Sequence, residues 1–343
     1  MDHVEFLQIE PTTRCNFTCG FCAGRSMRQS DLPFSRLEQA LLAFPRLRHV
    51  ELQGEGESLM HPRFVEMVEL LRARGVRVSF ITNGSYLTPE TIRRLLDAGI
   101  EKISVSLESA DPAEFQRIRG GRFEKVLRGL ESLIAARDAR QLDRPVIGLA
   151  VTVLRSTRDR LTSIIALYRR LGLDGGIVVQ PLQRMAAYKK TYSESLLDEE
   201  LSESEAEALR LCARRLLRRI EAQRAPVKGF YDELWAGWAP AQGRCPWLER
   251  GLFVNHEGSI TACCMIKDTE HHSLGLLGQS APGEILAART GMRDQLRRGQ
   301  IPAACTGCEV AQRATQSRTA HLLRQVQQIP QRLRSLLTAD SIG

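Results

Sequence analysis

The 343-residue sequence predicts an α/β protein whose core is a partial (β/α)6 barrel of the TIM type, with a small C-terminal domain and a helical tail. From residue 4 to about 180, six short β-rich runs alternate with helical patterns. This alternation is typical of a parallel sheet with its helices on the outside. Because a closed barrel of this type needs eight such units, six units predict an open barrel.

The six predicted strands and the helices between them follow from local sequence patterns. The strands are residues 4–10, 49–53, 76–82, 102–107, 145–154 and 176–182. The helices are residues 33–44, 62–74, 88–98, 122–140 and 158–171. The helix at 88–98 has the clearest boundaries, because Thr88 can cap it, Pro89 suits its first turn and Gly99 suits its end.

Beyond the barrel, which spans residues 1–183, three further regions are predicted. Residues 184–239 form a helical linker that contains a charged helix at 202–224. Residues 240–310 form a small cysteine-bearing module rich in glycine and turn signals, and residues 311–343 form a helical tail.

The net charge of +8 is spread over solvated helix faces and predicts no particular partner. The tail carries several arginines but no aromatic residue, whereas nucleic-acid binding usually combines a basic patch with base-stacking aromatics. No apolar stretch approaches the roughly 18–20 residues that cross a bilayer, and the N-terminus lacks a signal-peptide pattern. We therefore expect a cytoplasmic protein that binds neither nucleic acid nor membrane.

Eight of the nine cysteines fall into two groups, which indicates two sites rather than a disulfide framework. Thiols of a cytoplasmic protein are usually reduced. Cys15, Cys19 and Cys22 lie on the loop after the first strand, and Cys212 stands apart. The second group consists of Cys245, Cys263, Cys264, Cys305 and Cys308.

Polar residues at the carboxyl ends of the later strands are expected to share one mouth with the first three cysteines, because barrel chemistry gathers at these ends. Residues 54–57 follow the second strand and residues 82–84, which include Asn83, follow the third. The remaining polar residues at strand ends are Ser106, Glu108, Thr152 and Gln180.

The number of cysteines in the first group indicates what they bind. Structural zinc takes four ligands, and the candidates for a fourth are the histidines His3, His49 and His61. Three thiolates suit an iron–sulfur cluster that keeps one iron open for another ligand. A zinc site that borrows a remote ligand is the alternative.

The pattern CxxxCxxC after a first strand, with Phe21 directly before Cys22, resembles the signature of the radical S-adenosylmethionine (radical SAM) enzymes. The resemblance implies that Cys15, Cys19 and Cys22 hold a 4Fe-4S cluster. It also implies that the open iron binds the amino and carboxylate groups of SAM. One electron from the cluster would then cleave SAM to a 5'-deoxyadenosyl radical, which abstracts hydrogen from a C–H bond.

The resemblance continues through about residue 182 and implies further SAM contacts. The run LQGEGESLMHP, residues 52–62, is similar to the family's GGEP segment, which places Gly56 and Glu57 at the SAM amino group. Ser58 stands where the family usually has proline. The other implied SAM contacts are Asn83, Ser106, Glu108, Arg119 and, beside the cluster, Phe21.

The second group of cysteines resembles the auxiliary-cluster domain called twitch, which is related to the longer SPASM domain. The resemblance implies that Cys245, Cys263, Cys305 and Cys308 hold a second 4Fe-4S cluster. Their spacing is similar to that of the 2-deoxy-scyllo-inosamine dehydrogenases. Four cysteines would ligate all four irons and favour electron transfer.

The alternative for this module is a zinc ribbon. Cys264 is an alternative ligand to Cys263, and Cys212 is expected to be a buried, inert thiol.

These resemblances imply a radical SAM enzyme that oxidises a small polar, sugar-like or aminocyclitol-like substrate by two electrons. The auxiliary cluster would accept the second electron, and a flavodoxin- or ferredoxin-type protein would supply the reducing electron. Gln180, Arg184 and Tyr188 are the candidate catalytic residues, by their position after the sixth strand.

The competing hypothesis is radical epimerisation, cross-linking or cleavage of a ribosomally synthesised peptide. The start of the barrel at residue 4 disfavours it, whereas the helix at 202–224 and the basic tail could dock an acidic leader. A non-enzymatic electron carrier or zinc scaffold would not explain the SAM-like residues at the other strand ends.

Overall fold

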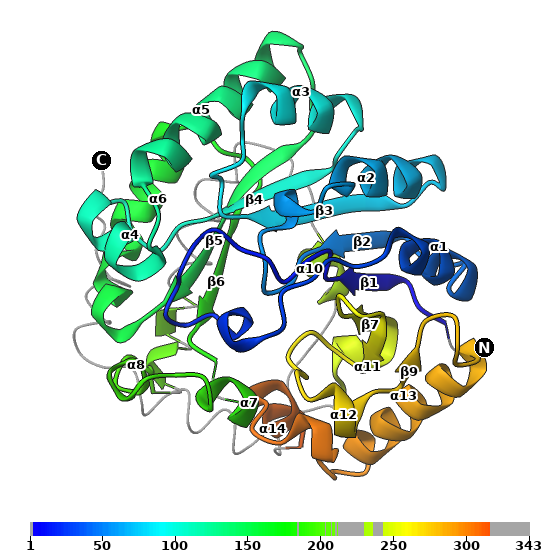
Figure 1. The fold of residues 1–343 in the computed structure, drawn as a ribbon. Helices are drawn as coiled ribbons and strands as arrows, with labels where there is room; N and C mark the ends of the chain where they lie inside the picture. The colour runs from blue at the N-terminus through cyan, green and yellow to red at the C-terminus, as the bar shows by residue number, and fades with distance from the viewer. Residues whose placement is uncertain are drawn as a thin grey trace.

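The computed structural model of the protein describes residues 3–183, 185–202, 204–206, 208–209, 211, 230–235 and 243–315. Within these residues the core is one sheet with the strand order β6-β5-β4-β3-β2-β1-β7-β8-β9. Figure 1 shows this sheet curving through the molecule, with helices along its outer face. The predicted α/β fold with a partial parallel barrel is confirmed.

The first six strands are parallel and lie in sequence order across the sheet. They are β1 (Phe6–Ile9), β2 (His49–Leu52), β3 (Arg77–Thr82), β4 (Lys102–Ser106), β5 (Val146–Val153) and β6 (Ile177–Pro181). Each lies within one of the predicted strands. Because all six are parallel, their carboxyl ends meet at one edge of the sheet.

Helices follow these strands, as the repeating pattern predicts. They are α1 (Phe34–Ala43), α2 (Phe64–Ala73), α3 (Pro89–Asp97), α4 (Pro112–Arg119), α5 (Phe123–Ala139) and α6 (Leu161–Arg170). Shorter 3-10 turns are η1 (Ala23–Ser26), η2 (Ser58–Met60) and η3 (Arg155–Arg160). The predicted cap of α3 is confirmed, since the Thr88 side chain accepts a hydrogen bond from the Thr91 amide at 3.2 Å.

Helix α4 is an element that the sequence analysis did not predict. The Asp111 side chain caps it by accepting from the Glu114 amide at 2.8 Å, and Pro112 occupies its first turn. Gly120, at a φ of 69°, ends it in the left-handed region that favours glycine. These cap signals were present in the sequence, but the helix is too short to show a clear apolar periodicity.

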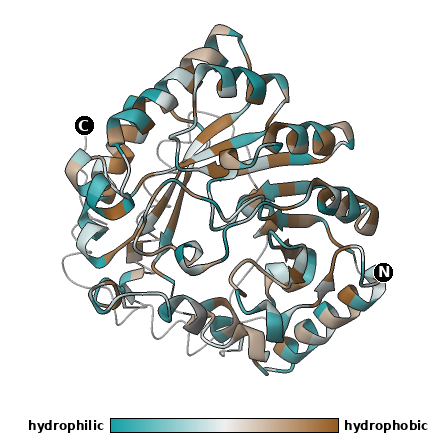
Figure 2. Cartoon of the chain, viewed as in Figure 1, coloured by the Kyte–Doolittle hydropathy of each residue, from teal (hydrophilic) through white to brown (hydrophobic). Residues whose placement is uncertain are grey.

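The hydrophobic core lies between the sheet and its helices. Figure 2 shows apolar residues concentrated along the central strands and polar residues along the outer faces of the helices. Leu7, Leu52 and Phe80 from three adjacent strands are fully buried. This packing makes the strands a rigid support for the loops at their carboxyl ends.

The C-terminal module joins the same sheet. Strand β7 (Gly251–Val254) pairs in parallel with β1, and β8 (Ser259–Thr261) and β9 (Gly275–Leu276) continue the sheet as antiparallel strands. The helices of the module are α11 (Pro246–Arg250), α12 (Thr269–His272), α13 (Pro282–Arg297), η4 (Ala303–Cys305) and α14 (Glu309–Thr315). The module therefore reaches the mouth of the barrel beside the first strand.

The predicted domain boundaries remain predictions, although α14 runs across the expected boundary at residue 310. The described elements between barrel and module are α7 (Ala186–Lys189), α8 (Glu194–Leu197) and α10 (Phe230–Leu234). Arg184, Cys212, most of the predicted helix at 202–224 and the tail beyond residue 315 lie outside the described residues. Every helix in the described parts of the chain is too short or too polar to span a membrane.

Candidate active site

The loop after β1 carries the first three cysteines into a pocket at the mouth of the barrel. Cys15, Cys19 and Cys22 line this pocket, which has a volume of about 210 Å³, together with Phe17 and Glu55. The Cys15 residue is exposed, Cys22 is half-buried and Cys19 is buried. The sequence prediction that these three residues share one site is consistent with this placement.

Contacts on both sides of the cysteines hold the loop in place. The Arg14 guanidinium donates to the Asp31 carboxylate at 3.0 and 2.7 Å and to the Met60 carbonyl at 2.9 Å. The Thr18 amide donates to the Arg119 carbonyl at 3.0 Å. The loop is therefore tied to the segments that follow β2 and β4.

Burial changes the acidity of these thiols. It is the largest factor that raises the pKa of Cys22, and the nearby Glu55 carboxylate raises it further. Burial also raises the pKa of Cys19, although the positive charge of Arg119 partly opposes this effect. Because burial favours the protonated thiols, these cysteines would have to lose their protons when they bind a metal.

The donor set fits an iron–sulfur cluster better than a zinc ion. Among the residues that line the described pocket, no histidine joins the three thiols. The three histidines considered as a fourth zinc ligand form hydrogen bonds elsewhere. The His61 ring is 3.0 Å from the Leu32 carbonyl oxygen. The His49 ring is 2.9 Å from the Ser79 hydroxyl, and the His3 ring is 3.0 Å from the Glu5 carboxylate.

A single metal ion needs several ligands within bonding distance of one point. Among the described residues, no three cysteine, histidine or carboxylate side chains are arranged in this way. Three thiols spaced around a pocket match the ligands of a 4Fe-4S cluster that keeps one iron open.

Residues 54–57 form a second loop that packs closely against the cysteine loop. The Glu57 amide donates to the Arg14 carbonyl at 2.8 Å. The Glu57 carboxylate accepts from the Thr82 hydroxyl and from the Asn83 amide, both at 2.6 Å. The Glu57 side chain thus joins the ends of β2 and β3, and its predicted contact with SAM stays a prediction.

Gly56 is the point of closest approach between the two loops. A Cβ atom at this position would lie 2.3 Å from the Thr12 carbonyl oxygen and 2.7 Å from the Arg14 carbonyl oxygen. Both neighbours are backbone atoms, which cannot move without displacing the cysteine loop. The close packing of the two loops therefore requires glycine.

The variant Gly56→Ala is expected to lose most of its capacity to bind iron at the first site and to unfold at a lower temperature. Iron per chain after anaerobic reconstitution and thermal unfolding of the unloaded chain measure these effects. Gly291→Ala in α13 is the matched control, because a Cβ there meets nothing within 4 Å and alanine favours a helix. Equal iron content in both variants would contradict the packing argument.

Two of the predicted SAM contacts, Glu108 and Arg119, pair with each other. The Arg119 guanidinium lies 2.6 Å from the Glu108 carboxylate at its Nη2 atom, and the side chains are 9% and 0% exposed. Burial alone would lower the pKa of Arg119, but Glu108 and the neighbouring thiols raise it. The pair lies beside the cysteine loop, since the Cys19 thiol is 3.8 Å from the Arg119 carbonyl.

The other predicted cofactor contacts lie at the same mouth. The Asn83 amide group is 3.8 Å from the Cys15 sulfur and donates to the Asn16 side chain at 2.9 Å. Phe21 packs near Arg119, whose guanidinium carbon lies 5.7 Å from the centre of the Phe21 ring. Ser106 is half-buried at the carboxyl end of β4.

The predicted catalytic residues are only partly brought together. The Tyr188 hydroxyl donates to the Glu55 carboxylate at 3.2 Å, and Tyr188 is 6% exposed. Gln180 is half-buried at the end of β6, paired with Thr152 in the register of the sheet. Tyr188 therefore reaches the cysteine pocket through Glu55, whereas Gln180 stays on the strand edge.

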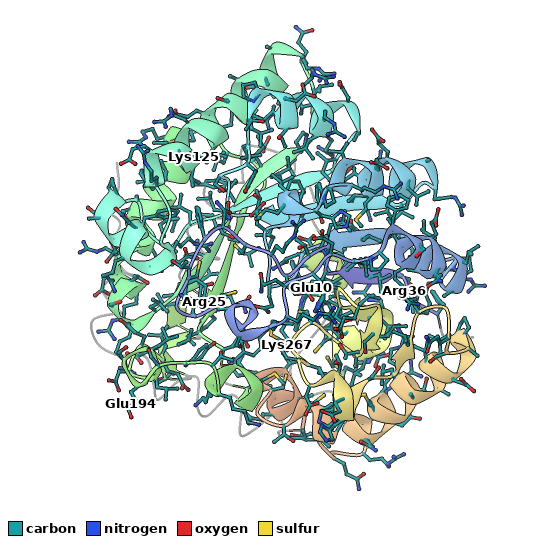
Figure 3. All side chains as sticks on the ribbon, in the orientation of Figure 1. Glu10, Arg25, Arg36, Lys125, Glu194 and Lys267 are labelled. Atoms are coloured by element: carbon teal, nitrogen blue, oxygen red, sulfur yellow. The ribbon has the colours of Figure 1, made fainter. Side chains whose placement is uncertain are left out.

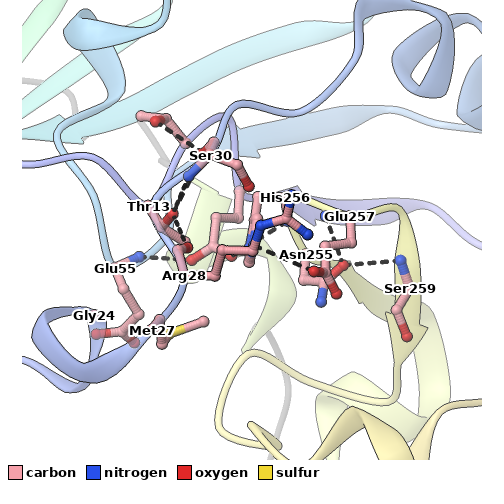
Figure 4. A network of polar contacts seen from close by, with 12 residues as sticks. Thr13, Gly24, Met27, Arg28, Ser30, Glu55, Asn255, His256, Glu257 and Ser259 are labelled. Carbon is pink, nitrogen blue, oxygen red and sulfur yellow. Dashed lines mark hydrogen bonds and ion pairs between the residues drawn. The ribbon is translucent and has the colours of Figure 1, made fainter.

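Sequence reasoning missed a polar network between β1 and the C-terminal module. The Glu10 carboxylate accepts from the Glu55 amide at 2.8 Å and lies 2.9 Å from the His256 ring, as Figure 4 shows around Glu55 and His256. The Lys267 ammonium lies 2.6 Å from the Glu55 carboxylate. Figure 3 places Glu10 and Lys267 toward the centre of the molecule, whereas Glu194 lies at its edge.

The second group of thiols gathers in one apolar cluster of the module. Cys245, Cys263, Cys305 and Cys308 pack in this cluster with residues such as Leu248. Burial is the main cause that raises the pKa of Cys263, and the charges of Cys264 and of the other three thiols raise it further. The four predicted ligands therefore lie close enough to interact.

Cys264 has a different environment from these four. It is buried, and burial raises its pKa to about 12 although the charge of Lys267 opposes this. Cys264 thus interacts with Lys267 of the polar network and also packs with Cys245 and Cys263, and its place as an alternative ligand to Cys263 stays a prediction.

Comparison with known proteins finds similarity mainly in the first half of the chain. A family model for the Radical SAM superfamily matches residues 9–167. The tungsten-containing aldehyde ferredoxin oxidoreductase cofactor-modifying protein of Pyrococcus furiosus is 28% identical over 186 residues, which cover 51% of this chain and 51% of that protein. The AdoMet-dependent heme synthase of Methanosarcina barkeri is 31% identical over 175 residues, covering 48% and 46%.

A third relative, the GTP 3',8-cyclase 1 of Pseudomonas aeruginosa, is 35% identical over 142 residues, which are 39% of this chain and 43% of the enzyme. The chain thus spans about half the length of the curated relatives it matches. The three relatives have different names and activities, so the similarity does not specify a reaction for this chain.

Solved structures share the fold over most of the chain. Streptococcus suis SuiB bound to its precursor peptide SuiA has a TM-score of 0.68 at 12% identity, covering 94% of this chain and 74% of SuiB. The structure of anSMEcpe with bound AdoMet and a peptide has a TM-score of 0.63 at 14% identity, covering 91% and 88%. At these identities the likeness is one of fold.

Proposed function

Because residues 9–167 match the family model of the Radical SAM superfamily, we propose that this chain is a radical SAM enzyme that oxidises a small polar substrate by two electrons, using SAM and two 4Fe-4S clusters. The substrate is a sugar-like or aminocyclitol-like molecule with a hydroxyl- or amine-bearing carbon. When bound, SAM and the first cluster supply a 5'-deoxyadenosyl radical that takes a hydrogen atom from this carbon.

The balance of the reaction assigns a task to each site. The hydrogen atom removes one electron and one proton from the carbon. A protein base takes the proton of the oxygen or nitrogen, and the second electron passes to the cluster held by Cys245, Cys263, Cys305 and Cys308. The product is a ketone or imine. A flavodoxin- or ferredoxin-type protein supplies the electron that cleaves SAM.

One observation supports this division of labour more than any other. Ala23, which directly follows Cys22, belongs to the same hydrophobic cluster as Met185, Tyr188 and Cys308. One cluster of packed side chains therefore extends from the residue next to Cys22 to Cys308 of the second group. Such close packing favours transfer of an electron from a substrate at the mouth to the second cluster.

The lining of the mouth favours a small polar substrate. A second pocket, with a volume of about 310 Å³, shares Cys22 and Arg25 with the first and is otherwise lined by Gly20, Ser26, Thr191 and Ser193. Its size is at the lower end of about 300–1,000 Å³ for small-molecule sites. Tyr188 and Gln180, with Arg184, remain the proposed substrate-side residues.

The double variant Cys305→Ala/Cys308→Ala is expected to retain SAM cleavage but lose product formation, since the first site stays intact and the second cannot hold its cluster. Iron should fall from about eight to about four atoms per chain. Deoxyadenosine release and a screen of aminocyclitols and sugars by mass spectrometry measure these effects. Cys264→Ala is the matched control.

Zinc in place of iron at the second site, or unchanged product formation by the double variant, would contradict the electron-accepting role. The alternative proposal is radical modification of a ribosomally synthesised peptide, which the shared fold of SuiB favours. A screen in which only a candidate precursor peptide changes mass would support this alternative over the small substrate.

A further inference from the structure

The feature that the proposed function leaves unexplained is a half-buried lysine of the C-terminal module that pairs with the barrel loop after β2. Lys267 follows Cys263 and Cys264 in the C-terminal module. Its ammonium lies 2.6 Å from the Glu55 carboxylate, and both side chains are 13% exposed. The ammonium also lies 5.7 Å from the centre of the Tyr188 ring and 5.2 Å from that of Phe253.

Glu55 connects this lysine to the first group of thiols. The Cys22 sulfur lies 3.4 Å from the Glu55 carbonyl oxygen and 3.6 Å from the Glu55 carboxylate. The Glu55 amide donates to Glu10 at 2.8 Å. Backbone and side chain of Glu55 are therefore both held within the loop that is similar to the SAM-binding GGEP segment.

The positions of Lys267 and Glu55 depend on each other because the two side chains form an ion pair away from most of the solvent. A buried ion pair is weak evidence of stability, but removal of one partner leaves an uncompensated buried charge. The Tyr188 hydroxyl also donates to Glu55, so the carboxylate is fixed from the side of α7 as well as from the module. Removal of Lys267 would leave the Glu55 carboxylate with the Tyr188 hydroxyl but without its cation.

We propose that Lys267 is a positioning residue, through which the C-terminal module holds Glu55 against Cys22 and completes the SAM-binding site of the barrel. The inference rests on the first cluster and SAM of the proposed function, but not on the substrate or on the second electron transfer. It predicts that the barrel depends on the C-terminal module for binding SAM. The first site should have its full affinity for SAM only when Lys267 of the module contacts Glu55.

The chain offers a matched control for simple docking of the module. Arg36 of α1 donates to the Leu277 carbonyl of the module, on a face where it touches neither Glu55 nor the cysteines. Replacing Arg36 by methionine weakens the attachment of the module without changing the first site directly. A role in docking alone would therefore give Arg36→Met and Lys267→Met the same phenotype.

The test uses Lys267→Met, Lys267→Arg, Glu55→Gln and Arg36→Met in the full chain. In the unloaded protein, hydrogen–deuterium exchange of residues 54–59 should become at least fivefold faster in Lys267→Met and Glu55→Gln. It should remain near the wild-type rate in Lys267→Arg and Arg36→Met. Exchange in the β3 strand serves as the internal reference for global stability.

The reconstituted protein gives a second readout. The dissociation constant of SAM should rise at least tenfold in Lys267→Met, and the change that SAM causes in the electron paramagnetic resonance spectrum of the reduced cluster should shrink. Lys267→Arg should restore both. Glu55→Gln, which keeps the shape of the side chain, tests the same contact if Lys267→Met does not fold.

Wild-type exchange and wild-type SAM affinity in Lys267→Met would overturn the inference, as would an equal loss in Arg36→Met. The proposed function fails in a different way, namely if the fully loaded wild-type chain does not cleave SAM. The two failures are therefore distinguishable in one set of samples.

Discussion

Replacement of Cys15, Cys19 and Cys22 together by alanine is expected to abolish SAM cleavage completely. The iron content should fall from about eight to about four atoms per chain, because the second cluster keeps its four thiols. The expected loss is total, since three ligands of the catalytic cluster disappear and no histidine joins these thiols in the described pocket. Anaerobic reconstitution, iron counting and a deoxyadenosine assay with dithionite measure the effect.

The outcomes of this experiment separate the possible metals. Cys264→Ala is the control for loss of a thiol outside the first group, because Cys264 is a buried cysteine of the C-terminal module. Retention of all the iron by the triple variant would show that the first group of thiols binds no cluster. One zinc per chain in the wild type, lost in the triple variant, would support the structural zinc site instead.

The variant Arg119→Met is expected to destabilise the chain by about 3–5 kcal/mol, the usual effect of removing one partner from a buried ion pair. The Glu108 carboxylate would remain buried without its partner, since its side chain is 0% exposed. Urea unfolding of the unloaded chain by circular dichroism measures the change.

A double-mutant cycle gives this prediction its control. Glu108→Gln/Arg119→Met should be more stable than Arg119→Met alone, because neither charge is then left unpaired. Arg93→Met, which breaks an exposed pair with Glu90 on α3, should change stability little. Similar unfolding midpoints for Arg119→Met and Arg93→Met would contradict the assignment of a buried ion pair.

The same variants test whether Arg119 contacts SAM, as the resemblance to radical SAM enzymes implies. If the guanidinium serves only the ion pair with Glu108, the double variant should bind SAM as the wild type does. If Arg119 also contacts the SAM carboxylate, the double variant should fold but bind SAM more weakly. Both quantities are measured on the same reconstituted samples.

Most of the barrel could be predicted from the sequence, since its signals are local. A run such as residues 76–82 has enough β-branched and apolar residues to indicate β3, and Thr88 with Pro89 marks the start of α3. The three cysteines of the first site lie within eight positions, so their common pocket needs little of the tertiary structure.

The contacts between distant segments could not be predicted in this way. Nothing in residues 251–254 indicates that β7 pairs with β1 of the barrel as well as with β8 of its own module. Glu108 and Arg119 each resemble a SAM contact, and their pairing depends on how α4 packs above the end of β4. Periodicity and spacing describe neighbours along the chain, whereas these contacts depend on packing in three dimensions.

The sequence by itself determined the strand and helix order of the barrel, the grouping of the cysteines and the family that they resemble. The tertiary structure alone decided that the second module extends the barrel sheet and that its Lys267 reaches Glu55, which is 212 positions earlier in the chain. The physical reason is that secondary structure and short motifs depend on local propensity. A buried charge, by contrast, is stable only where the whole fold brings its partner.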